Sequence, residues 1–176
     1  MKSKNILAYF LILTSILIKA QNNPSVEKSI YSFQIGTVGA WFQNETKLSN
    51  TIALRTEIGL ETDITYKVGF FIAPEITLEP RWYYNIKKRA QKKRDISNNS
   101  ANFFTVKTSF RSDVFEISNY YTKRARNTLY IIPKWGIKRN IGVNFNYELG
   151  FGLGYFSESY NEGPIAELHM RIGYNF

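Results

Sequence analysis

The sequence predicts an all-β protein folded as a single antiparallel up-and-down β-barrel of about eight strands. Apolar and polar residues alternate along most of the chain after residue 20, which is the period of a strand and not of a helix. Aromatic residues make up 16% of the 176 residues, which is too many for a disordered chain. The length suits one domain, and the absence of cysteine excludes a disulfide framework or a thiol nucleophile.

The first twenty residues are interpreted as a secretory signal peptide, which leaves 21–176 as the barrel domain. Lys2 and Lys4 precede an apolar run over 6–18, and Ala20 offers a cleavage site. This run is shorter than the ~20 apolar residues that a membrane-spanning helix needs. No later segment suits a spanning helix, so we expect the exported chain to be either soluble or inserted in a membrane as a β-barrel.

The alternation predicts eight strands. They cover 30–43, 51–62, 70–86, 102–111, 114–119, 128–138, 143–157 and 164–176. The weakest is Val114–Asn119, because a bulge before it instead of a turn would reduce the count to seven. An even number lets an antiparallel barrel close with both termini at one end, which favours eight. Pro74, Pro80 and Pro133 fall inside predicted strands, and we expect bulges there.

The connections between these strands predict a topology. With the termini on the periplasmic side, the links 44–50, 87–101, 120–127 and 158–163 would lie outside the cell. Long outer loops and short inner turns are typical of a bacterial outer-membrane barrel. Two basic clusters would then face the anionic headgroups of lipopolysaccharide. The clusters are Lys87, Lys88, Arg89, Lys92, Lys93 and Arg94, and Lys123, Arg124 and Arg126. The alternatives are a solvated loop without a partner or, remotely for an exported chain, a nucleic-acid patch.

The polar face of the strands contains equal numbers of acids and bases, which indicates that it faces a narrow lumen. Charges enclosed there would have to pair, since an isolated buried charge costs several kcal/mol. The apolar face would then contact lipid. The alternative is a soluble barrel with the charged face in water. The predicted ion-pair network is Arg55, Glu57, Glu61, Glu75, Glu79, Arg81, Lys107, Arg111, Glu116, Lys134, Lys138, Glu148, Glu167 and Arg171.

The C-terminal segment carries a family resemblance. Its ending, Arg171-Ile172-Gly173-Tyr174-Asn175-Phe176, alternates apolar and polar residues and closes on Phe. It resembles the C-terminal strand of Gram-negative outer-membrane β-barrel proteins, and the domain 21–176 resembles their small eight-stranded members. The resemblance implies residence in the outer membrane and recognition of Gly173, Tyr174 and Phe176 by the barrel assembly machinery. It implies no activity.

Enzymatic chemistry has one weak candidate in this sequence. The only imidazole is His169, and Glu167 lies on the same face of its strand. A lipid A- or phospholipid-modifying enzyme centred on His169 is therefore one alternative, and a small selective pore is another. Eight strands enclose little more than side chains, which favours a closed lumen and a structural or surface-interaction role. We expect neither a cofactor nor a metal site.

Overall fold

The structure is a computed structural model that describes residues 24–65, 69–119 and 126–176, so the predicted signal peptide lies outside the described residues. Eight antiparallel strands form a closed barrel, because β1 pairs with both β2 and β9. The predicted fold class, an eight-stranded antiparallel β-barrel, is confirmed. The strands are β1 (Ser29–Gly36), β2 (Gly39–Lys47), β3 (Ile52–Thr65), β4 (Gly69–Trp82), β5 (Asn102–Arg111), β7 (Thr128–Ile141), β8 (Phe145–Glu158) and β9 (Glu162–Asn175).

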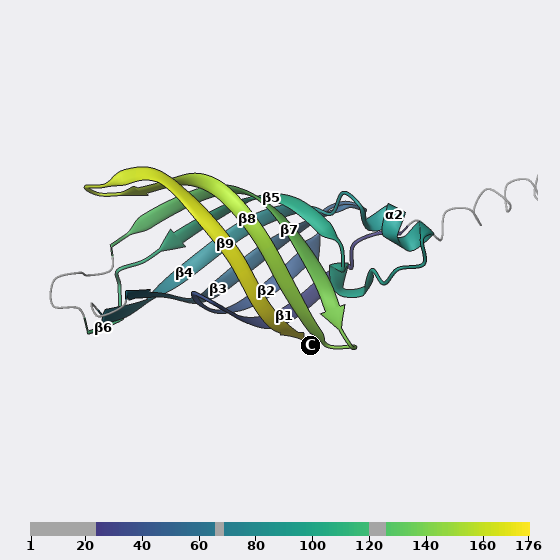
Figure 1. The fold of residues 1–176 in the computed structure, drawn as a ribbon, viewed down its shortest axis with the longest axis horizontal. Coiled ribbons are helices and arrows are strands. Elements are labelled where there is room, and N and C mark those ends of the chain that lie inside the picture. Colours follow the sequence, from purple (N-terminus) through teal and green to yellow (C-terminus); the bar gives the residue numbers. More distant parts are fainter. Residues whose placement is uncertain (1–23, 66–68, 120–125) are drawn as a thin grey trace, which may run out of the picture.

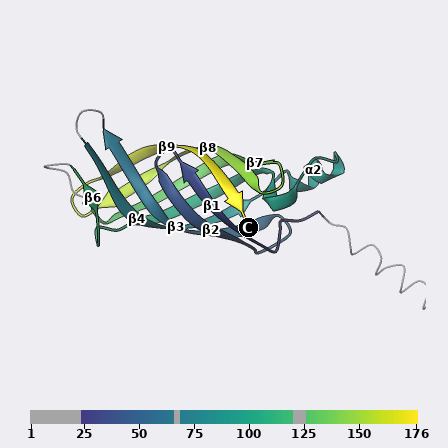
Figure 2. The ribbon, with the colours of Figure 1, turned by 90° about the horizontal axis from the view of Figure 1, so that it is seen from below.

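Three short elements lie outside the barrel wall. Helix α2 (Ile86–Gln91) and the 3₁₀ turn η1 (Ser97–Asn99) belong to the β4–β5 connection, and β6 (Ile117–Ser118) belongs to the β5–β7 connection. Figure 1 shows α2 and the C-terminus at one end of the barrel and β6 at the other, and Figure 2 shows the same arrangement from below. No helix among the described residues is long and apolar enough to cross a membrane.

Two of the eight predicted strands are wrong, and the errors cancel in the count. The predicted strand 30–43 is the β1–β2 hairpin, which turns at Thr37 and Val38. Thr and Val favour strands, so the only local turn signal is the flanking pair Gly36 and Gly39, the second of which has a φ of 148°. The predicted strand 114–119 forms only β6, which pairs with Phe71 and Ile72 of β4 beyond the end of β5.

These two errors change the predicted topology. We call the end where β1 begins and β9 ends the terminal end, and the opposite one the hairpin end. The β2–β3, β4–β5 and β7–β8 connections join strand ends at the terminal end, whereas the β1–β2, β3–β4, β5–β7 and β8–β9 connections join strand ends at the hairpin end. The prediction that 44–50 and 87–101 lie opposite the termini is therefore wrong, because the extra turn at 37–38 reverses the direction of β2 to β5. The predicted link 158–163 does lie opposite the termini, and most of the link 120–127 lies outside the described residues.

The alternation of the strands separates two kinds of surface. Charged and amide side chains point into the barrel and are buried, as Arg55 is with 0% of its surface exposed. The apolar neighbours point outward, and Ile58 is 60% exposed. Bulges expected at the prolines are absent: the β4–β5 register is the same on both sides of Pro80, and the β7–β8 register is the same on both sides of Pro133. Each proline only skips ladder hydrogen bonds.

An apolar cluster fills the terminal end of the barrel. Val26 precedes β1, and Tyr83, Ile86 and Ala101 belong to the β4–β5 connection; all pack with Ala53 and Phe103 of the barrel wall. The backbone fixes this plug, because the N–H of Val26 donates to the carbonyl of Asn50 (3.0 Å) and the N–H of Lys138 donates to Ala101 (2.9 Å). The lumen is therefore closed at its terminal end.

Candidate functional site: the charged interior

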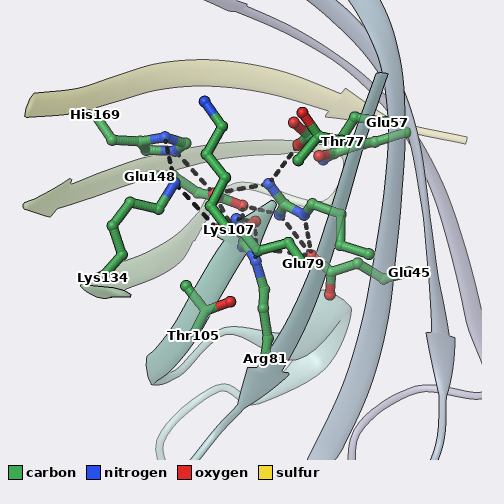
Figure 3. A network of polar contacts seen from close by, with 12 residues as sticks. Glu45, Glu57, Thr77, Glu79, Arg81, Thr105, Lys107, Lys134, Glu148 and His169 are labelled. Atoms are coloured by element: carbon green, nitrogen blue, oxygen red, sulfur yellow. Dashed lines mark hydrogen bonds and ion pairs between the residues drawn. The ribbon is translucent and has the colours of Figure 1, made fainter. Parts of the chain in front are cut away.

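Glu148 lies at the centre of the charged interior, where it is fully buried (Figure 3). Both of its carboxylate oxygens accept hydrogen bonds from Arg55 of β3 and from Arg81 of β4; Arg81 Nη1 lies 3.0 Å from Oε2. His169 Nε2 lies 3.1 Å from the same oxygen, and Gln34 donates to Oε1 at 3.2 Å. One carboxylate thus joins strands β1, β3, β4, β8 and β9 across the lumen.

Glu45 connects this network to the plug. Its Oε1 accepts from Arg55 at 2.5 Å and from Lys138 at 3.1 Å. Its Oε2 accepts from the hydroxyl of Tyr83 at 2.8 Å and from the amide of Asn99 at 2.7 Å. Because Tyr83 and Asn99 belong to the β4–β5 connection, the ion pairs of the interior also hold the plug in place.

A second cluster lies nearer the hairpin end, around Glu167 of β9. Its carboxylate accepts from Lys107 at 3.0 Å and from Lys134 at 3.0 Å. Lys134 also pairs with Glu79 at 3.0 Å, and Lys107 lies 3.6 Å from Glu75. Two lysines therefore bridge acids from opposite walls of the barrel.

The remaining interior cations combine ion pairs with aromatic contacts. Arg171 donates to Glu57 at 2.8 Å, and its guanidinium lies 3.6 Å from the centre of the Trp41 ring. Arg111 pairs with Glu61 (3.4 Å) and Glu158 (3.3 Å). Aromatic faces attract cations, so these contacts help to compensate for the loss of hydration.

Thirteen of the fourteen predicted network residues lie in the barrel interior and form ion pairs there. Glu116 lies instead in the β5–β7 connection, immediately before β6. The prediction missed Glu45 and Glu158. Glu45 follows the predicted end of the first strand, and Glu158 follows that of the seventh, so each lay in a predicted loop. With them, the interior ion pairs among the described residues join seven Lys and Arg side chains to eight Glu side chains.

His169 is buried among charged groups of this network. Its Nε2 faces Glu148 at 3.1 Å, and its Nδ1 lies 3.5 Å from Lys134 Nζ and 3.8 Å from Glu167. Among the described residues, its hydrogen bonds and ion pairs are with these three side chains. The ring is thus positioned by carboxylates on two sides, while no described serine or threonine is bonded to it.

A cavity of about 190 Å³ adjoins His169. Lys107, Glu167 and Arg171 supply polar groups to its wall, and outward-facing Leu168 and Met170 of β9 also line it. This mixture arises because the ladder between β1 and β9 ends at Gly36 opposite Arg171, with one further hydrogen bond from the N–H of Thr37 to the carbonyl of Met170 (3.3 Å). Residues 162–169 of β9 have no strand partner on that side among the described residues.

The described residues of the two predicted basic clusters lie at opposite ends of the barrel. The cluster Lys87–Arg94 belongs to α2 and its C-terminal side, at the terminal end, and this corrects its predicted position. Arg126 is at the hairpin end, with its guanidinium 5.9 Å from the Tyr160 ring. Lys123 and Arg124 lie outside the described residues.

The C-terminal residues lie at the terminal end of β9. Gly173 faces inward, where an added Cβ would lie 2.6 Å from the side chain of Gln34. Tyr174 and Phe176 face outward, with ring centres 5.5 Å apart, and Phe176 also packs near Phe42 at 6.3 Å. They form part of an aromatic belt around the outside of this end.

No protein-family model, curated protein or solved structure matches this chain. The resemblance to small outer-membrane barrels therefore stays a prediction. Among the described residues, no group of three or more His, Cys, Asp or Glu side chains is arranged to hold a metal ion.

Proposed function

We propose that this chain is an integral outer-membrane β-barrel with a plugged, ion-paired interior and a structural or surface-interaction role. The observation that carries the proposal is the inverted polarity of the barrel. Thirty-five large apolar side chains of the described residues are exposed, while most of the charged side chains of the strands are buried. Soluble proteins rarely expose apolar patches above a few hundred Å², so a lipid environment suits this exterior better than water.

The positions of the termini suggest an orientation in that membrane. The described chain begins and ends at the terminal end. Insertion from the periplasm therefore requires only the four connections of the hairpin end to cross the bilayer. We therefore propose that the terminal end faces the periplasm. The barrel assembly machinery would meet the chain there, and lipopolysaccharide would meet the connection that contains Arg126.

Fractionation combined with gel mobility tests the membrane proposal. The protein should co-sediment with the outer membrane, and unheated samples should migrate differently from boiled ones because a closed barrel resists detergent unfolding. A soluble periplasmic protein expressed in the same cells provides the fractionation control. Recovery of the mature chain as a monodisperse species in detergent-free buffer would contradict the proposal.

The plug supports a barrel that does not conduct. The cluster around Val26, Tyr83 and Ile86 fills the terminal end, and the Glu148 network crosses the middle of the lumen. Purified protein in planar bilayers should therefore give no channel steps. Reproducible conductance would favour the small-pore alternative instead.

The cavity beside His169 supports a second candidate, a lipid-modifying enzyme. A lipid at the exposed edge of β9 could reach a cavity whose wall holds both apolar side chains and His169. His169→Gln would then abolish modification of lipid A or phospholipid, as read by mass spectrometry of extracted lipids. Glu162→Gln, at the exposed start of β9, is the control variant and should leave the modification unchanged. Identical lipid profiles with and without the wild-type protein would remove this candidate.

A further inference from the structure

A cationic cavity lies at the terminal end, between α2 and the barrel wall. Its volume is about 420 Å³. Its charged lining residues are all basic, and the other residues that line it are neutral. The five cations are Lys88, Arg89, Lys92, Arg94 and Arg139. The charged interior has the opposite composition, since each cation there has an acid beside it.

Among the described residues, none of the five cations of this cavity forms an ion pair with a carboxylate. Arg89 donates to the backbone carbonyl of Asp95 at 2.9 Å, and Arg139 donates to Asn102 Oδ1 at 2.5 Å, so both guanidiniums are held by neutral acceptors. The Asp95 carboxylate accepts hydrogen bonds from Ser97 and from Asn140 at 2.7 Å. Burial and the nearby charge of Arg94 lower the pKa of Arg89, and the charge of Asp95 offsets this only in part, so an anion placed here would be stabilised.

On this side of the barrel the aromatic belt consists of Trp82, Tyr84, Phe104 and Trp135. Tyr84 also lines the cavity and so joins it to the belt. The Tyr84 ring lies 5.2 Å from that of Phe104 and 6.1 Å from that of Trp82, and its hydroxyl accepts from Trp135 Nε1 at 3.0 Å. Trp82, Phe104 and Trp135 are exposed on the outer wall. A charged cavity that borders an amphipathic aromatic surface matches the boundary between headgroups and acyl chains.

We infer that this cavity binds the phosphate of an anionic phospholipid in the leaflet at the terminal end, with the acyl chains against the aromatic belt. The inference rests on the proposed function, because it requires the belt to lie in a membrane. The arginine guanidiniums offer the forked donors that suit a phosphate, and the lysines add positive charge. A free phosphate would use the cations alone, whereas a lipid would use the cations and the aromatic surface together.

Fluorescence quenching by brominated lipids tests this inference. Trp82 and Trp135 lie beside the cavity, whereas Trp41 is enclosed in the lumen. The full-length mature protein is inserted into vesicles that contain phosphatidylcholine and phosphatidylglycerol, with one of the two lipids brominated. We expect phosphatidylglycerol to be preferred about tenfold at this surface, since each cation near an anionic headgroup contributes measurably.

Two variants with equal loss of charge distinguish the cavity from general attraction. Lys88→Gln/Lys92→Gln/Arg94→Gln neutralises three lining cations and leaves Arg89 and Arg139 with their hydrogen bonds. The control, Lys28→Gln/Lys87→Gln/Lys93→Gln, removes three exposed charges from the same end but not from the cavity. The first should abolish the preference, and the second should preserve it. Equal loss in both variants would overturn the inference in favour of diffuse charge.

Further arms identify the ligand and separate the two proposals. Added inorganic phosphate at constant ionic strength should leave the preference unchanged; displacement of the lipid would show that free phosphate is the ligand and would overturn the lipid inference. Loss of heat-modifiable gel mobility would show that the cavity variant does not fold. In that case the lipid preference of the wild type is measured at rising NaCl concentration. A preference for phosphatidylglycerol that does not fall with salt overturns the inference. A wild-type barrel that inserts without any preference overturns this inference alone, whereas failure to insert overturns the proposed function.

Discussion

Replacing the central acid, Glu148→Gln, tests whether ion pairs hold the barrel together. The change keeps the shape of the side chain but removes its charge from two fully buried guanidiniums, Arg55 and Arg81. Breaking a buried pair costs roughly 3–5 kcal/mol when the partner is left alone. Here Arg55 keeps Glu45 and Arg81 keeps Glu79, so we expect the lower end, a loss of about 3 kcal/mol in the free energy of unfolding.

Urea unfolding in lipid vesicles, followed by tryptophan fluorescence and by gel mobility, measures this free energy. Glu27→Gln is the matched control, because Glu27 is exposed and precedes β1. Combining Glu148→Gln with Arg81→Gln should destabilise the barrel by less than the sum of the two single changes, because both changes remove the same ion pair. A single Glu148→Gln variant as stable as the control would refute the reasoning.

Three further predictions follow from the terminal end. Gly136→Val should destabilise the barrel by roughly 1–3 kcal/mol in the same unfolding assay, because a Cβ at this position would lie 2.4 Å from the Phe103 ring; a stable variant would contradict the tight packing of the plug. Partial burial raises the pKa of Asp95, but hydrogen bonds from Ser97 outweigh it and lower the pKa below its usual value of 3.8. The ionised carboxylate therefore stabilises the folded β4–β5 connection above pH 3.8, and this stabilisation is lost as the pH falls through the lowered pKa. Hydrogen-exchange protection over 86–99, taken relative to the intrinsic exchange rate at each pH, should therefore fall only at acidic pH, and Asp95→Asn should remove this dependence. Trypsin should spare residues 87–94 in intact cells and cleave there once the outer membrane is permeabilised; cleavage in intact cells would reverse the proposed orientation.

The sequence was most informative where alternation continued over many residues. Between Ile52 and Leu60 every second side chain except Thr56 is apolar, and the structure places Arg55 and Glu57 of the opposite face in the lumen. The alternation specifies which face a residue occupies, because successive side chains of a strand point in opposite directions. It did not specify where one strand ended and the next began, and Glu45 was missed for that reason.

The amino-acid pattern by itself determined the class of fold and most of the inward-facing charges. Only the tertiary structure decided which end of the barrel carries each connection, because the turn at Thr37 and Val38, two strand-forming residues marked only by the flanking Gly36 and Gly39, reverses the chain. It also decided the partners: Glu148 and Arg55 are 93 residues apart in sequence, and only closure of β1 against β9 encloses the lumen in which they meet. Likewise, the basic residues of α2 and Arg139 come from separate segments, and their shared cavity exists only in the folded barrel.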